Sequence, residues 1–162
     1  MKHNIIILIL TLVLTSCVTD EPEIESTVKV GDKVPDFIVE LNNGTRLASD
    51  DLIGRHSVIT FFNTSCSDCQ RELPVIDSLY RRRPELIVAC IARSESATSI
   101  SKYWEENNLS VPYSAQPDAS VYNLFATAGI PRIYIIDESQ TVVAQFDDTF
   151  ITLSALESAL NF

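Results

Sequence analysis

The sequence predicts one α/β domain, with a central mixed sheet flanked by helices and a β-hairpin at its N-terminal end. Two continuous apolar runs, residues 57–63 and 85–92, are typical of strands buried on both faces. Segments with helical periodicity follow them, which favours a sheet covered by helices. The length of 162 residues suits a single domain with a proper core.

The individual elements follow from local patterns. Residues "DFIVEL" (36–41), the turn "NNGT" and "RLASDDL" indicate the hairpin. The other predicted strands are 57–63, 85–92, 132–137 and 141–148. Four helices are predicted. The first starts at about Cys69 and has Leu73, Ile76, Leu79 and Tyr80 on one face, and the second, 95–109, has Ile100, Tyr103 and Trp104 inward. The other two predicted helices are 119–129 and 152–161.

The first segment, "MKHNIIILILTLVLTSC", has a basic start at Lys2 and an apolar run from Ile5 to Leu14. Such a run is too short to span a bilayer, which takes about 20 residues. Residues 1–16 are therefore predicted to be a secretory signal peptide. A buried N-terminal helix is the alternative, although no polar stripe interrupts the run.

The end of this segment, "LTSC", resembles the lipobox of bacterial lipoproteins, in which the cysteine is diacylated and becomes the first mature residue. The resemblance implies that Cys17 is a lipid anchor, since acyl chains contribute about 0.8 kcal/mol per buried methylene. Residues 17–30 are predicted to be an acidic tether and 31–162 the domain. We therefore expect an exported lipoprotein on the membrane, facing the periplasm or the cell surface; an ordinary cleaved signal peptide is the alternative.

The charge of the chain argues against a nucleic-acid partner. There are 22 acidic and 12 basic residues, a formal charge of −10, and no basic stripe along a predicted face. The one basic cluster, Arg81 to Arg83, falls where a helix is predicted to end. There it complements the helix dipole.

The spacing of Cys66 and Cys69, in "FFNTSCSDCQRELP", suggests chemistry, whereas Cys90, inside "LIVACIA", is predicted to be a buried inert thiol. The pair could be a redox couple, half of a metal site or a structural disulfide. A structural zinc site needs four ligands, and beyond carboxylates only His56 and Cys90 remain, so no metal is expected. A structural bridge this short would restrain the unfolded chain little.

As a redox couple, the two cysteines have unequal positions. Cys66 lies at or just before a predicted helix start, where backbone N–H groups and the helix dipole stabilise a thiolate. It is predicted to be the nucleophile, and Cys69, one turn further in, the resolving thiol. The expected partners are protein thiols and disulfides and an unknown electron donor, and no cofactor is expected beyond the Cys66–Cys69 disulfide.

Residues 31–160 resemble the membrane-anchored thioredoxin-like proteins of the TlpA/ResA group. The matching motifs are "GDKVPDFIVELNNGTRLASDDLIGRHSVITFFNTSCSDCQRELP" and "GIPRIYIID". The resemblance implies a thioredoxin-like fold and thiol–disulfide oxidoreductase activity. It also implies that Pro131 is cis and packs against the disulfide, and that Ile130 exposes its backbone to a substrate strand. A trans proline that opens a strand is the alternative.

The acidic residue that this family carries three positions after the second cysteine falls on Glu72. A carboxylate on the same helix face as Cys66 and Cys69 could accept or donate the proton of the buried thiol. The alternative is that a Glu is simply favourable in the first turns of a helix.

The sequence also departs from the family. Ser65 replaces a frequent tryptophan, Ser67-Asp68 stands where many relatives have proline, and Thr60 replaces the buried carboxylate of thioredoxins. Ser65, Ser67 and Asp68, with Ile130, are predicted to contact the substrate. Asp68 should repel a thiolate, which favours a reductase. The bulky Ile130 before the proline also resembles the reducing members of the wider superfamily, which implies the same direction.

Two further functions are the alternatives to this oxidoreductase. A peroxiredoxin shares the fold, but Ile59 and Asn63 occupy the positions where its mechanism expects Pro and Thr. A non-catalytic surface lipoprotein could use the scaffold as a binding module, although packing alone does not require both thiols.

Overall fold

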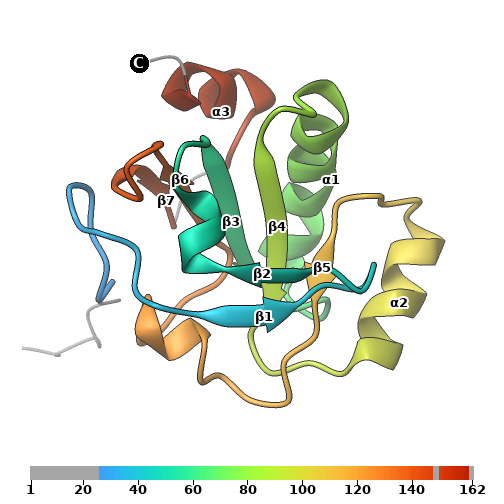
Figure 1. Ribbon diagram of the computed structural model, residues 1–162. Helices are drawn as coiled ribbons and strands as arrows, with labels where there is room; N and C mark the ends of the chain where they lie inside the picture. The colour runs from blue at the N-terminus through green and yellow to red at the C-terminus, as the bar shows by residue number, and fades with distance from the viewer. Residues whose placement is uncertain (1–25, 148–149, 161–162) are drawn as a thin grey trace, which may run out of the picture.

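The computed structural model describes residues 26–147 and 150–160, which form a five-stranded sheet, a separate hairpin and three α-helices (Figure 1). The strands are β1 (Ile38–Glu40), β2 (Arg46–Ala48), β3 (Ser57–Phe62), β4 (Ile87–Ala92), β5 (Tyr113–Ser114), β6 (Arg132–Ile136) and β7 (Val142–Phe146). The helices are α1 (Ser67–Arg82), α2 (Ala97–Glu106) and α3 (Leu153–Leu160), with 3-10 turns η1 (Ser49–Leu52) and η2 (Tyr122–Leu124).

The sheet is mixed, as predicted. Its order is β5-β4-β3-β6-β7, with β3, β4 and β5 parallel and β6 and β7 antiparallel to their neighbours. The carboxyl end of β3 therefore meets the amino end of β6, where Phe61 pairs with Arg132. This arrangement brings the residues after β3 beside the residues before β6.

Both faces of the sheet are covered, which explains the continuous apolar runs of β3 and β4. Val58 and Phe62 face a core that includes side chains of α1 and α3, whereas Ile59 and Phe61 face one that includes the hairpin β1–β2 (Figure 1). Cys90 is fully buried in the first core, as predicted, and burial raises the pKa of its thiol. No helix among the described residues is long and apolar enough to cross a bilayer.

Several boundaries differ from the sequence prediction. The predicted helix 119–129 is only the short turn η2, because Ala126 bridges to Ser26 and the backbone turns at Gly129, with φ of 81°, toward Pro131. The loop before it contains β5, which was not predicted, and β7 ends at Phe146. Tyr103 is only partly buried against the core.

Residues just before the predicted domain boundary at residue 31 also pack against the core. Val28 is buried, and its N–H donates to the carbonyl of Phe125 at 3.0 Å. The predicted signal peptide, Cys17 and the first part of the predicted tether lie outside the described residues.

Candidate redox site

The turn after β3 places Cys66 at the start of α1. The Asn63 side-chain oxygen accepts from the Ser65 N–H at 2.9 Å, and the Asn63 carbonyl accepts from the Cys66 N–H at 3.1 Å. Such a turn ends the strand and lets a helix start at once. The helix begins at Ser67 rather than near Cys69, and Cys66 is its N-cap residue.

The two thiols differ in access to solvent. The Cys66 sulfur accepts a hydrogen bond from the Cys69 N–H at 3.3 Å, as the side chain of an N-cap residue does. Cys66 is half-buried and Cys69 fully buried, and both are free thiols in this structure. Burial, followed by the interaction with the Cys66 thiol, raises the pKa of Cys69. One thiol is therefore open to a partner and the other is shielded.

The loop before β6 completes the front of the site. The peptide bond between Ile130 and Pro131 is cis, as the family resemblance implied. The Cys66 thiol donates to the Ile130 carbonyl, with sulfur and oxygen 3.5 Å apart. Ile130 itself is partly exposed, and Pro131 is buried.

Glu72 lies one turn beyond Cys69 on α1, and its side chain is buried. Burial raises its pKa to about 7, while a hydrogen bond from the Ile151 N–H and the charge of Arg71 oppose this shift. The charge of Glu72 contributes in turn to the raised pKa of Cys69. A carboxyl that changes protonation near neutral pH beside a buried thiol suits proton transfer.

Ser65, Ser67 and Asp68 are exposed around Cys66, where a substrate could reach them. Asp68, however, forms an ion pair with Arg71, whose guanidinium also lies 5.2 Å from the centre of the Phe150 ring. The repulsion predicted between Asp68 and the thiolate is therefore weakened, because the Arg71 cation one helical turn away compensates part of the Asp68 charge.

Glu95, which the sequence did not single out, holds the residue two positions before Cys66. Its carboxylate accepts from the Thr64 N–H at 2.8 Å, from the Thr64 hydroxyl, and from the Ser99 hydroxyl at 2.7 Å. The Gln70 side chain donates to the Thr64 carbonyl at 2.7 Å. The bonds of Glu95 join the turn before Cys66 to the start of α2, and the bond of Gln70 joins the same turn to α1.

Arg132 anchors the loop that carries Ile130. Its side chain is fully buried and donates twice to the Ala128 carbonyl, at 2.9 and 2.7 Å, and to Asp147 at 3.2 Å.

Thr60 lies at the position where thioredoxins have a buried carboxylate. Its hydroxyl has no hydrogen-bond partner among the described residues.

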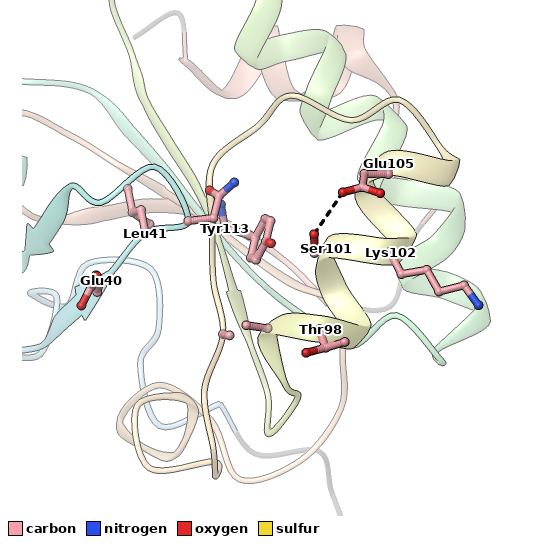
Figure 2. A pocket seen from close by; sticks show the side chains of 10 residues that line it. Glu40, Leu41, Thr98, Ser101, Lys102, Glu105 and Tyr113 are labelled. Atoms are coloured by element: carbon pink, nitrogen blue, oxygen red, sulfur yellow. Dashed lines mark hydrogen bonds between the residues drawn. The ribbon is translucent and has the colours of Figure 1, made fainter.

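A cleft of about 740 Å³ lies between the hairpin and α2, and Figure 2 shows its lining. Its side chains are mostly polar, and the Ser101 hydroxyl donates to Glu105 within it, at 3.4 Å. No cysteine lines this cleft, so it is separate from the redox site. Within residues 26–147 and 150–160, no group of three or more His, Cys, Asp or Glu side chains could hold a metal ion.

A CxxC pair at the start of the first helix, facing a cis-proline, defines a redox protein with a thioredoxin-like fold. The Redoxin family profile matches residues 29–160, and the chain belongs to this family. A relative from Oceanobacillus iheyensis, named thiol-disulfide oxidoreductase ResA, is 25% identical over 99% of this chain and 86% of its own.

Solved structures show the same fold. A proposed protein disulfide isomerase of Bacteroides thetaiotaomicron superposes with a TM-score of 0.79, at 21% identity, over 85% of this chain and 91% of its own. An exposed lipoprotein thioredoxin of Streptococcus pneumoniae superposes with a TM-score of 0.66, at 18% identity, over 78% and 98% of the two chains.

Proposed function

We propose that the protein is a thiol–disulfide oxidoreductase that reduces disulfides of other proteins outside the cytoplasm. The arrangement of the two thiols carries this proposal: Cys66 is accessible at the helix start, and Cys69 is buried one turn behind it. Exchange through a mixed disulfide requires one exposed attacking thiol and one second thiol within reach.

The reaction has two steps. The Cys66 thiolate attacks one sulfur of the substrate disulfide, so that a mixed disulfide forms and the other substrate sulfur leaves as a thiolate. Cys69 then gives its proton to Glu72 and attacks the Cys66 sulfur, which releases the second substrate thiol. Two electrons pass to the substrate, and a separate thiol or dithiol donor must reduce the Cys66–Cys69 disulfide before the next cycle.

The surroundings of Cys66 support the reductive direction. Neither hydrogen-bond partner of its sulfur, the Ile130 carbonyl or the Cys69 N–H, is a cation. The Ile130 carbonyl accepts a hydrogen bond that a Cys66 thiol can donate and a thiolate cannot, so this contact favours the thiol. This carbonyl therefore opposes the stabilisation that the Cys69 N–H and the helix start give to a thiolate. The less the thiolate is stabilised, the better the couple is as a reductant.

We also propose that Cys17 carries a lipid that holds the domain at the outer side of a membrane. The basic start, the apolar run and "LTSC" support this proposal. Metabolic labelling with a palmitate analogue tests it. Wild type should incorporate label and Cys17→Ser should not, whereas equal labelling of the two would exclude an anchor at this cysteine.

Insulin reduction with dithiothreitol as donor tests the oxidoreductase function. Wild type should accelerate precipitation of the insulin B chain, and Cys66→Ala should not. Equal inactivity of wild type and Cys66→Ala would favour the non-catalytic binding module instead. Hydrogen peroxide consumption, measured in parallel, tests the peroxiredoxin alternative.

A further inference from the structure

Arg93 lies beside the redox site but takes no part in the two steps of thiol–disulfide exchange. It directly follows β4, and its N–H donates to the carbonyl of Phe62 at the end of β3, at 2.7 Å. Its guanidinium lies over the ring of Tyr122, with the guanidinium carbon 4.6 Å from the ring centre. The end of β4 thus places a cation next to the strand that leads to Cys66.

Tyr122 connects Arg93 to the loop that faces Cys66. The ring is fully buried, and its hydroxyl donates to the carbonyl of Gly129 at 2.7 Å. Gly129 precedes Ile130, whose carbonyl accepts from the Cys66 thiol. One aromatic ring therefore separates the Arg93 guanidinium from the backbone beside which a substrate strand would lie.

Within residues 26–147 and 150–160, no acidic side chain pairs with the guanidinium of Arg93. Arg71 pairs with Asp68 and Arg132 with Asp147, but no oxygen among the described residues accepts a hydrogen bond from the Arg93 side chain. The residue is partly exposed. Stacking on an aromatic ring fixes the plane of a guanidinium while its N–H edge stays open, and that edge matches a carboxylate.

We infer that Arg93 binds an acidic side chain of the substrate polypeptide, close in sequence to the cysteine that Cys66 attacks. Arg93 is then a specificity-determining residue, and this role rests on the proposed oxidoreductase function. Covering the Tyr122 ring does not account for the arrangement alone, because an apolar side chain would cover it without presenting unpaired donors beside the site.

The test uses two disulfide-bonded peptides that differ only in carrying Glu or Gln at the positions flanking the cysteine. Wild type should reduce the Glu peptide with a kcat/KM about tenfold higher at low salt, the gain expected for one charge-assisted hydrogen bond. Arg93→Gln should remove this preference, so that the variant reduces the Glu and Gln peptides with equal kcat/KM. Arg82→Gln is the matched control, since Arg82 is exposed at the far end of α1.

The possible results separate the two proposals. Reduction of both peptides at equal rates by wild type, or a preference that persists in Arg93→Gln, would overturn the role of Arg93 alone. Failure of wild type to reduce either peptide would count against the oxidoreductase itself. Arg93→Lys keeps the charge but not the forked donors and should retain part of the preference, which tests the inference even where Arg93→Gln folds poorly.

Discussion

The Cys66 sulfur lies 3.5 Å from the carbonyl oxygen of Ile130, the residue before the cis-proline. The start of α1 and the loop before β6 thus meet at the accessible thiol. Cys69, on the inner side of the helix, is shielded from both solvent and substrate. The two cysteines are therefore suited to different steps, attack by Cys66 and resolution by Cys69.

Cys69→Ala should accumulate mixed disulfides with substrate proteins, because Cys66 still attacks and nothing resolves the product. Non-reducing gels of cell extracts, followed by mass spectrometry, would show these adducts and identify the substrates. Cys66→Ala is the matched control and should form few adducts, because its remaining site thiol is buried. Equal adduct formation by the two variants would contradict the assignment of the nucleophile.

Glu72→Gln should lower kcat for disulfide reduction by about a hundredfold, as expected for loss of a proton-transfer group. With a pKa of about 7, Glu72 is ionised above neutral pH and can then take the proton of Cys69. The wild-type rate should rise through pH 7, and this inflection should be missing in Glu72→Gln. An unchanged pH profile in Glu72→Gln would show that Glu72 does not transfer the proton. Glu106→Gln, on the exposed surface of α2, is the control and should keep the wild-type profile.

The same residue should make stability depend on pH. Because its pKa is raised from 4.5 to about 7 in the folded protein, folding favours the protonated form. The contribution of protonated Glu72 to the free energy of unfolding is complete below pH 4.5 and is lost as the pH rises to about 7. The free energy of unfolding of wild type relative to Glu72→Gln should fall by up to about 3 kcal/mol over this range. Urea unfolding at several pH values measures it, and a constant difference would contradict the buried position of the carboxyl.

Asp68→Asn leaves Arg71 unpaired and should make the redox potential of the couple more positive, by no more than about 20 mV. The carboxylate is paired with Arg71, exposed ion pairs contribute about 0–1 kcal/mol, and about 30 mV corresponds to 1.4 kcal/mol. Arg71→Ala should make the potential more negative, because unpaired Asp68 then repels the thiolate. A shift to more positive values in Arg71→Ala would show that Asp68 does not act on the thiolate.

Glu95→Ala should destabilise the fold by about 1–3 kcal/mol, because it leaves the Thr64 N–H without its acceptor. Glu105→Ala removes an exposed carboxylate that also accepts from a serine hydroxyl, and it should be nearly neutral. Urea midpoints of the two variants provide the comparison. Equal effects would mean that the bonds of Glu95 contribute little to holding the turn.

The sequence predicted those parts of the fold that depend on local pattern. Buried strands such as β3 and β4 are continuous apolar runs, and the cysteine spacing fixed the place of the site. The cis state of Pro131 and the position of Glu72 followed from family resemblance. Asp68 and Arg71 are one helical turn apart, so their ion pair could have been predicted from the sequence pattern alone.

Other features depend on contacts between distant segments. The helix predicted at 119–129 fails because Ala126 bridges to Ser26, far away in the chain. The bonds between Glu95 and Thr64 likewise join segments that only the packed sheet brings together. A polar residue in a loop gives no sign in the sequence of the distant group that it will bind.

The equilibrium potential of the Cys66–Cys69 couple, measured against glutathione or dithiothreitol buffers, tests the proposed reductive function most directly. A single two-electron transition more negative than about −200 mV is expected, because the Ile130 carbonyl favours the Cys66 thiol and neither hydrogen-bond partner of the sulfur is a cation. A potential near −120 mV, typical of strong disulfide-forming oxidants, would contradict a reductase.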